Sequence, residues 1–304
     1  MISIILSLFL GLNYSNMSKV DGQILWQLRL PLVLTACCVG AALAVSSASL
    51  QVMLHNPLAD PGIIGITSGA SLVAACILLL GENVSPTSLQ YLLPLGCFIG
   101  ALISTLLIYA VAKRLVANHA AVILAGIAIS TLSGALIAWM HFFSDAQAMR
   151  NLTFWLMGSL YQADWPVLTI AMPIILISVG YLLRQGQAFN WYYFGANSAQ
   201  LAGLNVAKFR RTVLLACALS VGAAVSIAGS IAFIGLVVPH VLRLIFGYNN
   251  RFILPASALL GASLLLWVNL LSTSLAGISL PVSMVTATMG GPIFLYSIAR
   301  LSRK

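Results

Sequence analysis

The five carboxylates of this 304-residue chain are its most informative chemistry-bearing residues. Asp21, Asp60, Glu82, Asp145 and Asp164 all fall between long apolar stretches of the sequence. A carrier driven by protons or sodium ions usually keeps an Asp or Glu inside the membrane to hold the coupling ion. No apolar stretch has such a residue at its middle. If this chain moves a solute, we therefore expect the energy to come from outside the chain.

The other residues that could do chemistry form no site in the sequence. The five cysteines lie within apolar stretches, without metal-ligand spacing to a histidine or to one another, so we interpret them as buried thiols. His141 and His240 are isolated. The chain has no GxxxxGK[ST] phosphate loop, no HExxH motif and no convincing nucleophile–base pair. We expect no enzyme activity, no ATP hydrolysis, and neither cofactor nor metal held by the chain itself.

The composition is that of an integral membrane protein. It is 61% hydrophobic and only 6% charged, and a helix that crosses a bilayer needs about 20 apolar residues. We expect an all-α, polytopic fold with about ten membrane-crossing helices in a single domain over residues 1–304. The first span is short, but it lacks the basic start of a secretory signal, so we interpret it as a genuine span. The expected spans are 1–14, 31–53, 62–81, 89–112, 119–143, 166–183, 212–228, 231–247, 252–271 and 281–299.

The net charge of +9 is explained by orientation. With both termini on one side, eleven basic residues share that side and only Lys19, Arg29 and Arg150 lie on the other. This asymmetry predicts that both termini are cytoplasmic. A basic cytoplasmic rim also suits anionic lipid headgroups, and we expect no nucleic-acid partner. The eleven are Lys113, Arg114, Arg184, Lys208, Arg210, Arg211, Arg243, Arg251, Arg300, Arg303 and Lys304.

One connection is much longer than the others and runs from about residue 184 to 211. It contains a short helical pattern over 197–204, which Asn197 or Ser198 could cap and Gly203 could end. The segment is either an ordinary connector with interfacial aromatic residues or a docking surface for a cytoplasmic partner. Its length and its place near the middle of the chain favour docking.

A second unusual segment, HNPLADPGIIGITSGA, covers residues 55–70. Pro57 and Pro61 each remove a backbone donor and push the preceding residue out of helical geometry. Broken backbone at membrane depth is tolerated only against protein or a wet cavity. A plain tight turn explains the prolines but not Gly65, Ser68 and Gly69. The segment is therefore expected to line a pathway or a subunit boundary.

The two halves of the chain echo one another at a shift of 182 residues. This shift aligns Arg29 with Arg211, residues 39–42 with 221–224, Pro57 with Pro239, and Gly65 with Gly247. The expected topology runs the second and seventh spans in opposite directions. The echo is therefore compatible with an inverted repeat, an arrangement common in transporters.

A series of short motifs follows the same order as in a known family. They are LRLP at 28–31, GAALA at 40–44, NPLADPG at 56–62, LAG at 124–126, WLMGSL at 155–160, AGSIAFIGLVVPH at 228–240, Pro281 with VTA at 285–287, and GGPIF at 290–294. Over about residues 25 to 300 the sequence therefore resembles the FecCD family of permeases, which are ten-span subunits of binding-protein-dependent ABC importers for iron–siderophores, vitamin B12 and haem.

The resemblance implies an inner gate at the cytoplasmic end of a solute pathway. Asn56 and Leu58 occupy the family's gate positions in the Asn-Pro-Leu-Ala break, and Asn118 and His119 fall where the family has a second gate strip. His119 could titrate near neutral pH, although an interfacial histidine without a chemical role is the simpler interpretation.

The resemblance also implies two docking surfaces. Ala199, Leu201, Gly203 and Leu204 match the coupling helices that seat in the ATP-hydrolysing subunits, and Arg29 matches a basic periplasmic position that receives the solute-binding protein. Family members often carry further arginines at two positions where this chain has Leu32 and Ser272. We therefore expect binding-protein docking to rest on Arg29 together with other contacts.

The implied function is that of the membrane-spanning subunit of an importer in the bacterial inner membrane. Its implied partners are a second permease subunit (an identical copy or a sister chain), two ATP-binding cassette subunits that bind the ATP, and a periplasmic solute-binding protein. We expect an iron–siderophore as the solute, with vitamin B12 or haem as alternatives. An ion-coupled secondary carrier is the opposing class, and it would need the mid-span carboxylate that the sequence lacks.

Overall fold

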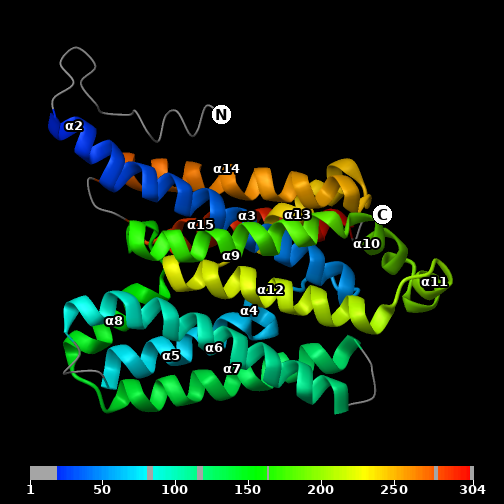
Figure 1. Ribbon diagram of the computed structural model, residues 1–304, viewed down its shortest axis with the longest axis horizontal. Coiled ribbons are helices and arrows are strands. Elements are labelled where there is room, and N and C mark those ends of the chain that lie inside the picture. Colours follow the sequence, from blue (N-terminus) through cyan, green and yellow to red (C-terminus); the bar gives the residue numbers. More distant parts are fainter. Residues whose placement is uncertain (1–18, 81–84, 115–118, 163, 277–279, 302–304) are drawn as a thin grey trace.

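The computed structural model describes residues 19–80, 85–114, 119–162, 164–276 and 280–301, and within these residues the chain is almost entirely helical, without strands (Figure 1). The first expected span, 1–14, lies outside the described residues. α2 (Lys19–Ile24), η1 (Leu25–Arg29) and α3 (Leu30–Met53) follow one another without interruption. The remaining elements are α4 (Pro61–Ile64), α5 (Ile66–Leu80), α6 (Pro86–Arg114), α7 (His119–Phe142), α8 (Ala146–Leu156), η2 (Leu160–Gln162), α9 (Trp165–Arg184), α10 (Gly186–Tyr193), α11 (Ala196–Leu201), α12 (Val206–Ala228), α13 (Ile234–Phe246), α14 (Asn250–Ala276) and α15 (Val282–Leu301).

The long helices confirm most of the expected spans. Six helices of the described residues are long and apolar enough to cross a membrane, and they begin at Gly22, Ser88, Ala121, Trp165, Val206 and Asn250. The expected spans 62–81 and 231–247 correspond to shorter apolar helices, α5 and α13. α5 begins late because irregular backbone at 54–60, the short helix α4 and the left-handed Gly65 precede it, and α13 begins after irregular backbone at 229–233. α15 takes the place of the last expected span.

The long helices lie roughly along one axis, so the molecule has two opposite ends (Figure 1). α11 projects at one end, which we call the α11 end, and α8 lies at the other, which we call the α8 end. α8 lies between the expected spans 119–143 and 166–183, where the sequence predicts no helix. Its first turns, AQAMR, are polar, and Asp145 caps the helix by accepting a hydrogen bond from the Ala148 amide.

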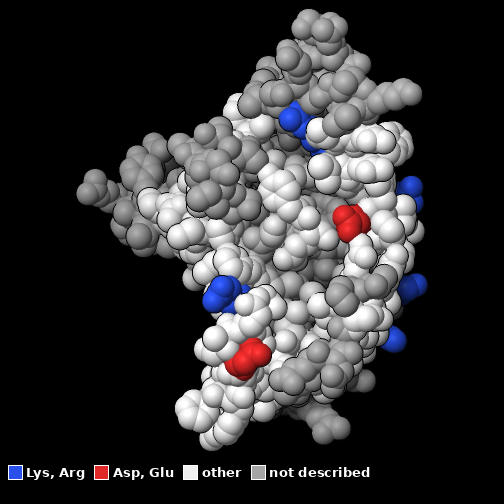
Figure 2. Space-filling view, turned by 90° about the vertical axis from the view of Figure 1, so that its left-hand side faces the viewer, with Lys and Arg blue, Asp and Glu red and all other residues white. Residues whose placement is uncertain are grey.

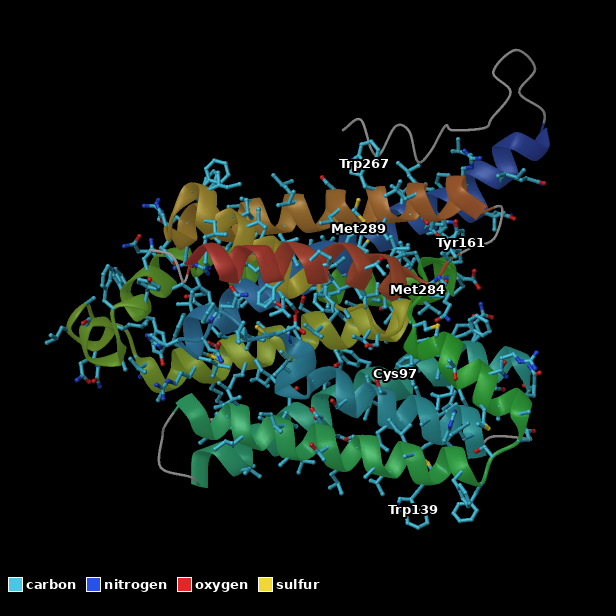
Figure 3. All side chains as sticks on the ribbon, turned by 180° about the vertical axis from the view of Figure 1, so that it is seen from behind. Cys97, Trp139, Tyr161, Trp267, Met284 and Met289 are labelled. Carbon is cyan, nitrogen blue, oxygen red and sulfur yellow. The ribbon has the colours of Figure 1, made fainter. Side chains whose placement is uncertain are left out.

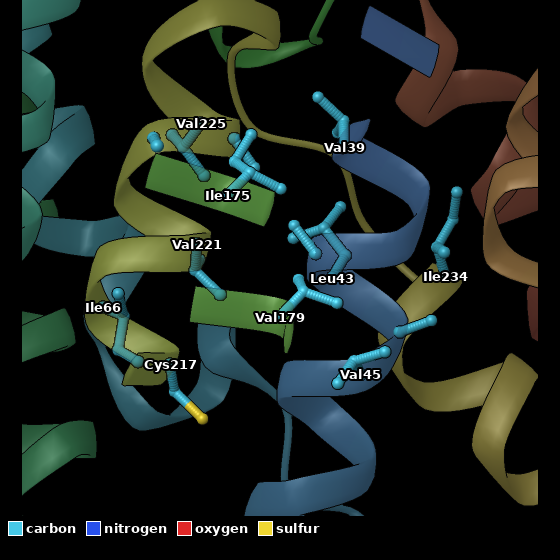
Figure 4. Packing of buried hydrophobic residues seen from close by; sticks show 14 of the residues in the cluster. Val39, Leu43, Val45, Ile66, Ile175, Val179, Cys217, Val221, Val225 and Ile234 are labelled. Atoms are coloured by element: carbon cyan, nitrogen blue, oxygen red, sulfur yellow. The ribbon is translucent and has the colours of Figure 1, made fainter. Parts of the chain in front are cut away.

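α3 is the central helix and is buried along nearly its whole length. It packs against α14, α12, α9 and α13. Small residues permit these close contacts, because a Cβ atom on Gly40 would overlap the backbone of Gly261 in α14. Branched side chains fill the remaining space, with Leu43 of α3 lying beside Val179 of α9 (Figure 4).

A second group of helices, α5, α6 and α7 with α8, packs beside this core and is joined to it mainly through α12 (Figure 1). Trp139 on α7 and Trp267 on α14 point away from the helices on opposite sides (Figure 3). Cys97 is buried, as expected for the cysteines, whereas Cys76 is exposed. Wide exposure of apolar side chains on α7 is consistent with contact to lipid or to another membrane subunit.

The repeat is only partly as expected. α3 and α12 run in opposite directions, which fits an inverted arrangement (Figure 1). However, they end at Met53 and Ala228, 175 residues apart, so the shift of 182 overruns the helix ends. It pairs Pro57, in irregular backbone, with Pro239, inside α13. Matches between small residues are common in membrane helices, and here they gave the wrong register.

Candidate functional site

The break after α3 is held by a few polar contacts at the α11 end. The Asn56 amide donates to the Gln51 carbonyl over 3.1 Å, and the Asn56 side-chain oxygen accepts from the Leu58 amide over 2.9 Å. His55 adopts a left-handed φ of 48°, and its ring lies 5.5 Å from that of Tyr192 in α10. Leu58 is 44% exposed. The break therefore presents an apolar side chain on a turn that one asparagine maintains.

Asp60 ends this break and ties it to two helices. Its carboxylate accepts from the Gly62 amide over 2.9 Å, which caps α4, and from the Ser47 hydroxyl of α3 over 3.0 Å. A Cβ atom on Gly235 of α13 would overlap both Ser47 and Asp60. Ser47 lies six residues before the end of α3, and a helix rises about 1.5 Å per residue. By Asp60 the chain has therefore returned about 9 Å along α3 from the end of that helix. Asp60 lies between apolar helices in the sequence, as expected, but in space it packs beside the apolar helices.

α4 is wedged between helices on its other side as well. A Cβ atom on Gly126 would overlap the Ile64 backbone, so α7 approaches α4 closely. Where α4 meets α5, Gly65 has a left-handed φ of 94°, and its carbonyl accepts from the Ser104 hydroxyl of α6 over 2.6 Å. Side chains and neighbouring helices thus satisfy the backbone groups that the break frees.

A second break, Gly229–Phe233, separates α12 from α13 and is held differently. The Ser283 hydroxyl of α15 donates to the Ser230 carbonyl over 2.6 Å and accepts from the Ala232 amide over 3.3 Å. The Ser159 amide donates to the Ala228 carbonyl over 2.9 Å. Phe233 has a left-handed φ of 69°. A cavity of about 340 Å³ lies between the two breaks, with Asp60 on one side and Ser230 and Phe233 on the other.

A larger cavity of about 410 Å³ opens beside the first break. Asn56 and Pro57 line it from the break, His240 and Arg243 from α13, and Tyr193 from α10. Arg243, one of the eleven basic residues expected on the cytoplasmic side, is only 8% exposed, so it is buried and does not belong to an exposed basic rim.

The partner-facing segment consists of α10 and α11. The Gly203 amide donates to Gln200 and the Leu204 amide to Ala199, each over 3.0 Å, and Gly203 has a φ of 88°. This is a Schellman ending, which requires a left-handed residue at the position of Gly203, so the expected end of the helix is confirmed. The expected start was wrong, because Gly195 precedes the first turn and the Ser198 hydroxyl bonds back to Phe194.

The exposure of the expected coupling residues differs sharply. Leu201 is 92% exposed at the tip of the segment, whereas Ala199 is fully buried and Leu204 is half-buried. The base of the segment is rigid, because Arg210 of α12 donates to the Tyr192 hydroxyl over 2.6 Å. Burial raises the pKa of Tyr192, and Arg210 opposes that shift. A packed base with a projecting apolar tip is suited to insertion into a groove of another protein.

Arg29 lies at the opposite, α8 end. It is half-buried at the end of η1, close enough to Tyr161 to oppose the rise that burial causes in the pKa of that phenol. Nearby, the Trp26 and Trp165 rings stack with centroids 5.4 Å apart, and the Trp165 indole donates to the Trp26 carbonyl. Figure 2 shows individual charged side chains scattered over the described part of this face, and the described residues form no dense charged patch there.

The second expected gate strip is only partly described. α7 begins at His119, whereas Asn118 lies outside the described residues. The structure therefore brings Asn56 and Leu58 together, places the coupling residues on one projecting segment at the same end, and sets Arg29 at the other end. Sequence reasoning missed Asp60, Gln51 and Arg243 as site residues. A charged residue inside the apolar helix 234–246 was the available signal for Arg243.

This architecture is that of a helical solute permease, with broken backbone between spans and a projecting segment at one end. The chain matches the model of the FecCD transport family over residues 1–300, and it belongs to that family. It is 39% identical over 292 residues to the vitamin B12 import system permease protein BtuC of Vibrio cholerae serotype O1, covering 94% of this chain and 86% of the relative. It is 41% identical over 274 residues to the hemin transport system permease protein HmuU of Yersinia pestis, covering 90% and 82%.

A solved structure gives the same result for the fold. It is described as an inward-facing conformation of a proposed metal-chelate type ABC transporter, and it matches with a TM-score of 0.89 at 30% identity, covering 98% of this chain and 96% of that chain. This chain is thus the permease subunit of an ABC importer, a protein of the bacterial inner membrane that functions with ATPase and binding-protein partners.

Proposed function

We propose that the solute of this importer is a metal-containing macrocycle, vitamin B12 or haem. The observation that carries this proposal is the similarity over nine-tenths or more of the chain to permeases named for vitamin B12 and for hemin. An iron–siderophore, the solute expected from the sequence, ranks behind the macrocycles, because the relatives described above are named for vitamin B12 and for hemin.

The proposed assembly follows from the two ends of the molecule. The α11 end is proposed to face the cytoplasm, because it carries Arg184, Lys208, Arg210, Arg211 and Arg251. The C-terminal helix α15 then runs toward the cytoplasm, and the proposed cytoplasmic N-terminus requires that the expected span 1–14 also crosses the membrane. Two ATP-binding cassette subunits, which bind the ATP, take the Leu201 tip into their grooves. A second permease subunit, identical or related, completes the pathway, and the binding protein docks near Arg29.

In this proposal Asn56 and Leu58 form the inner gate, with His119 and Asn118 as the second strip. ATP binding would shift the dimer between its two states only through contacts that differ between them. The break at 54–60 is suited to this role, because its turn depends on side-chain contacts of Asn56 and Asp60.

Uptake measurements test the substrate. The chain, its ATPase and its binding protein are reconstituted in liposomes, and accumulation of radiolabelled cyanocobalamin, haemin and a ferric siderophore is compared with and without ATP. We expect ATP-dependent accumulation of one of the two macrocycles. Accumulation of the siderophore alone would overturn the substrate proposal, and accumulation by the chain alone under a cation gradient would overturn the proposed energy source.

A substitution at the tip tests the coupling segment. Leu201→Glu should leave the folded chain unchanged, because this side chain is 92% exposed. It should reduce recovery of the ATPase subunit in a pull-down at least tenfold, since a buried unpaired charge in an apolar groove costs several kcal/mol. Phe143→Glu, at a 75% exposed apolar position at the α8 end, is the matched control. Equal ATPase recovery from both variants would exclude the coupling role.

A further inference from the structure

Three buried nitrogen-bearing side chains line the 410 Å³ cavity beside the first break. Gln51 is 5% exposed, and His240 and Arg243 are each 8% exposed. Within the described part of the chain, one nitrogen on each is buried without a hydrogen-bond partner: Gln51 Nε2, His240 Nε2 and Arg243 Nη1. Buried polar atoms in proteins are normally paired, so three unpaired nitrogens on residues that line one cavity need an explanation.

Arg243 is the centre of this group and is held firmly in place. Its Nη2 donates to the Ala48 carbonyl over 3.2 Å and to the Asn250 side-chain oxygen over 3.1 Å. Its guanidinium carbon lies 5.8 Å from the centre of the Tyr248 ring. These partners are all neutral. The positive charge is therefore buried and oriented without an anion to balance it among the contacts that the described residues make.

A buried, uncompensated cation is costly, and a water molecule can accept its hydrogen bonds without cancelling its charge. An oxyanion does both, because a carboxylate or a phosphate accepts several hydrogen bonds and pairs with the guanidinium. Gln51 Nε2, and His240 Nε2 in the tautomer that carries its proton there, are two further donors on residues that line the same cavity. We propose that this cavity is a binding site for an oxyanion, a carboxylate or phosphate group.

The surroundings of the cavity indicate what such a group would do. Asn56 and Pro57 of the proposed inner gate share its lining. Asn250, which accepts from Arg243, also donates from its backbone to the Asn190 side-chain oxygen of α10 over 2.7 Å. The site thus lies between the gate and the partner-facing segment. Its role in transport, receiving an anionic arm of the solute at the inner mouth, rests on the proposed function, whereas oxyanion binding itself does not.

Binding is tested on the purified full-length chain alone, so that failure of the importer proposal cannot mask it. The chain in uncharged detergent is titrated with inorganic phosphate or with succinate against sodium chloride of equal ionic strength, and the thermal midpoint Tm is followed. A ligand that binds only the folded state raises Tm in a saturable way. We expect such a rise with the wild-type chain and an apparent Kd at least tenfold weaker for Arg243→Gln.

Arg251→Gln is the matched control, because it removes the same charge from an exposed position at the same end. It should keep the wild-type titration. If Arg243→Gln does not fold, Gln51→Leu and His240→Leu replace it in the test. Each of these two variants should weaken oxyanion binding severalfold. Arg243→Lys should bind more weakly than the wild-type chain but better than Arg243→Gln. It keeps the positive charge but loses the planar guanidinium that can donate two parallel hydrogen bonds.

A second arm separates a free or solute-borne oxyanion from a lipid headgroup. The chain is placed in nanodiscs of phosphatidylcholine with or without phosphatidylglycerol, and Tm is measured for the same variants. A rise that needs Arg243 and appears only with phosphatidylglycerol would support the oxyanion site and identify a lipid phosphate as its occupant. Identical responses of the wild-type chain and Arg243→Gln in both arms, or no response in either, would overturn the proposal.

Discussion

The two chain breaks resemble each other in position and differ in construction. Each separates a long, buried helix from a short one, and each contains a non-glycine residue in the left-handed region, His55 or Phe233. The first break, at 54–60, is held by the side chains of Asn56 and Asp60 together with one backbone bond from Asn56 to Gln51, and it exposes Leu58 and borders an open cavity. In the second, at 229–233, the Ser283 hydroxyl bonds backbone groups of Ser230 and Ala232, and Gly229 packs directly against the Trp155 carbonyl.

This difference indicates which break can move. Side-chain hydrogen bonds at a surface can be exchanged for water at little net cost, whereas backbone packed against backbone has no room to adjust. We therefore expect the first break to change conformation during transport and the second to serve as a fixed joint between α12, α13 and α15. Each substitution below tests one side of that contrast.

The largest effect is expected at the second break from Gly229→Ala. Gly229 has φ 69° and ψ −165°, which is essentially restricted to glycine, and a Cβ atom there would overlap the Trp155 carbonyl. Backbone strain costs about 1–3 kcal/mol, and overpacking adds about 1–3 kcal/mol. We expect Tm in detergent to fall by more than for any other substitution proposed here. Gly180→Ala in α9, where the space is open, should leave Tm nearly unchanged. Equal Tm values for the two variants would refute the fixed joint.

An intermediate effect is expected from Asp60→Ala, which removes the hydrogen bonds that tie the first break to α3 and α4. The Ser47 hydroxyl and the Gly62 amide both lose their acceptor, and buried unpaired groups cost about 1–3 kcal/mol. Asp145→Ala, which removes a capping carboxylate from the exposed start of α8, is the control and should cost about 1 kcal/mol. Unfolding in detergent compares the two, and a smaller loss for Asp60→Ala would mean that its bond to α3 contributes nothing.

How far the sequence could predict this molecule is clear from the same segments. Long apolar runs predict the spans, because a helix forms all of its backbone hydrogen bonds within the segment itself. Pro57 and Pro61 predict the first break, because proline cannot continue a helix. The sequence did not predict the short helices α10 and α8. At the membrane edges, helices and loops both contain many polar residues, so composition does not distinguish them. Gly203 could be predicted as a helix end, because its left-handed conformation favours glycine.

The site was less predictable than the fold. Asn56 and Leu58 were recognised through a family motif, and the sequence could not show that Asn56 holds the turn by accepting from Leu58. The contacts of Asp60 with Ser47, and of Arg243 with Ala48, join residues 13 and 195 positions apart. Such pairings depend on how the helices pack together, and no local sequence pattern predicts them. Arg243 looked like one of many rim charges because burial is a property of the folded bundle.

The smallest effect on stability, and the most selective on transport, is expected from Asn56→Ala. The loss of one turn-forming hydrogen bond at a surface costs about 0.5–1.5 kcal/mol. Ser159→Ala removes a bond of the same kind at the α8 end, where the Ser159 hydroxyl accepts from the Tyr161 amide two residues on. The two variants should therefore lower Tm alike. If the first break is the moving gate, only Asn56→Ala should change ATP-dependent uptake, by at least severalfold, because Leu58 then loses its fixed position. Equal uptake by both variants would place the gate elsewhere in the chain and leave the contrast between the two breaks as one of packing alone.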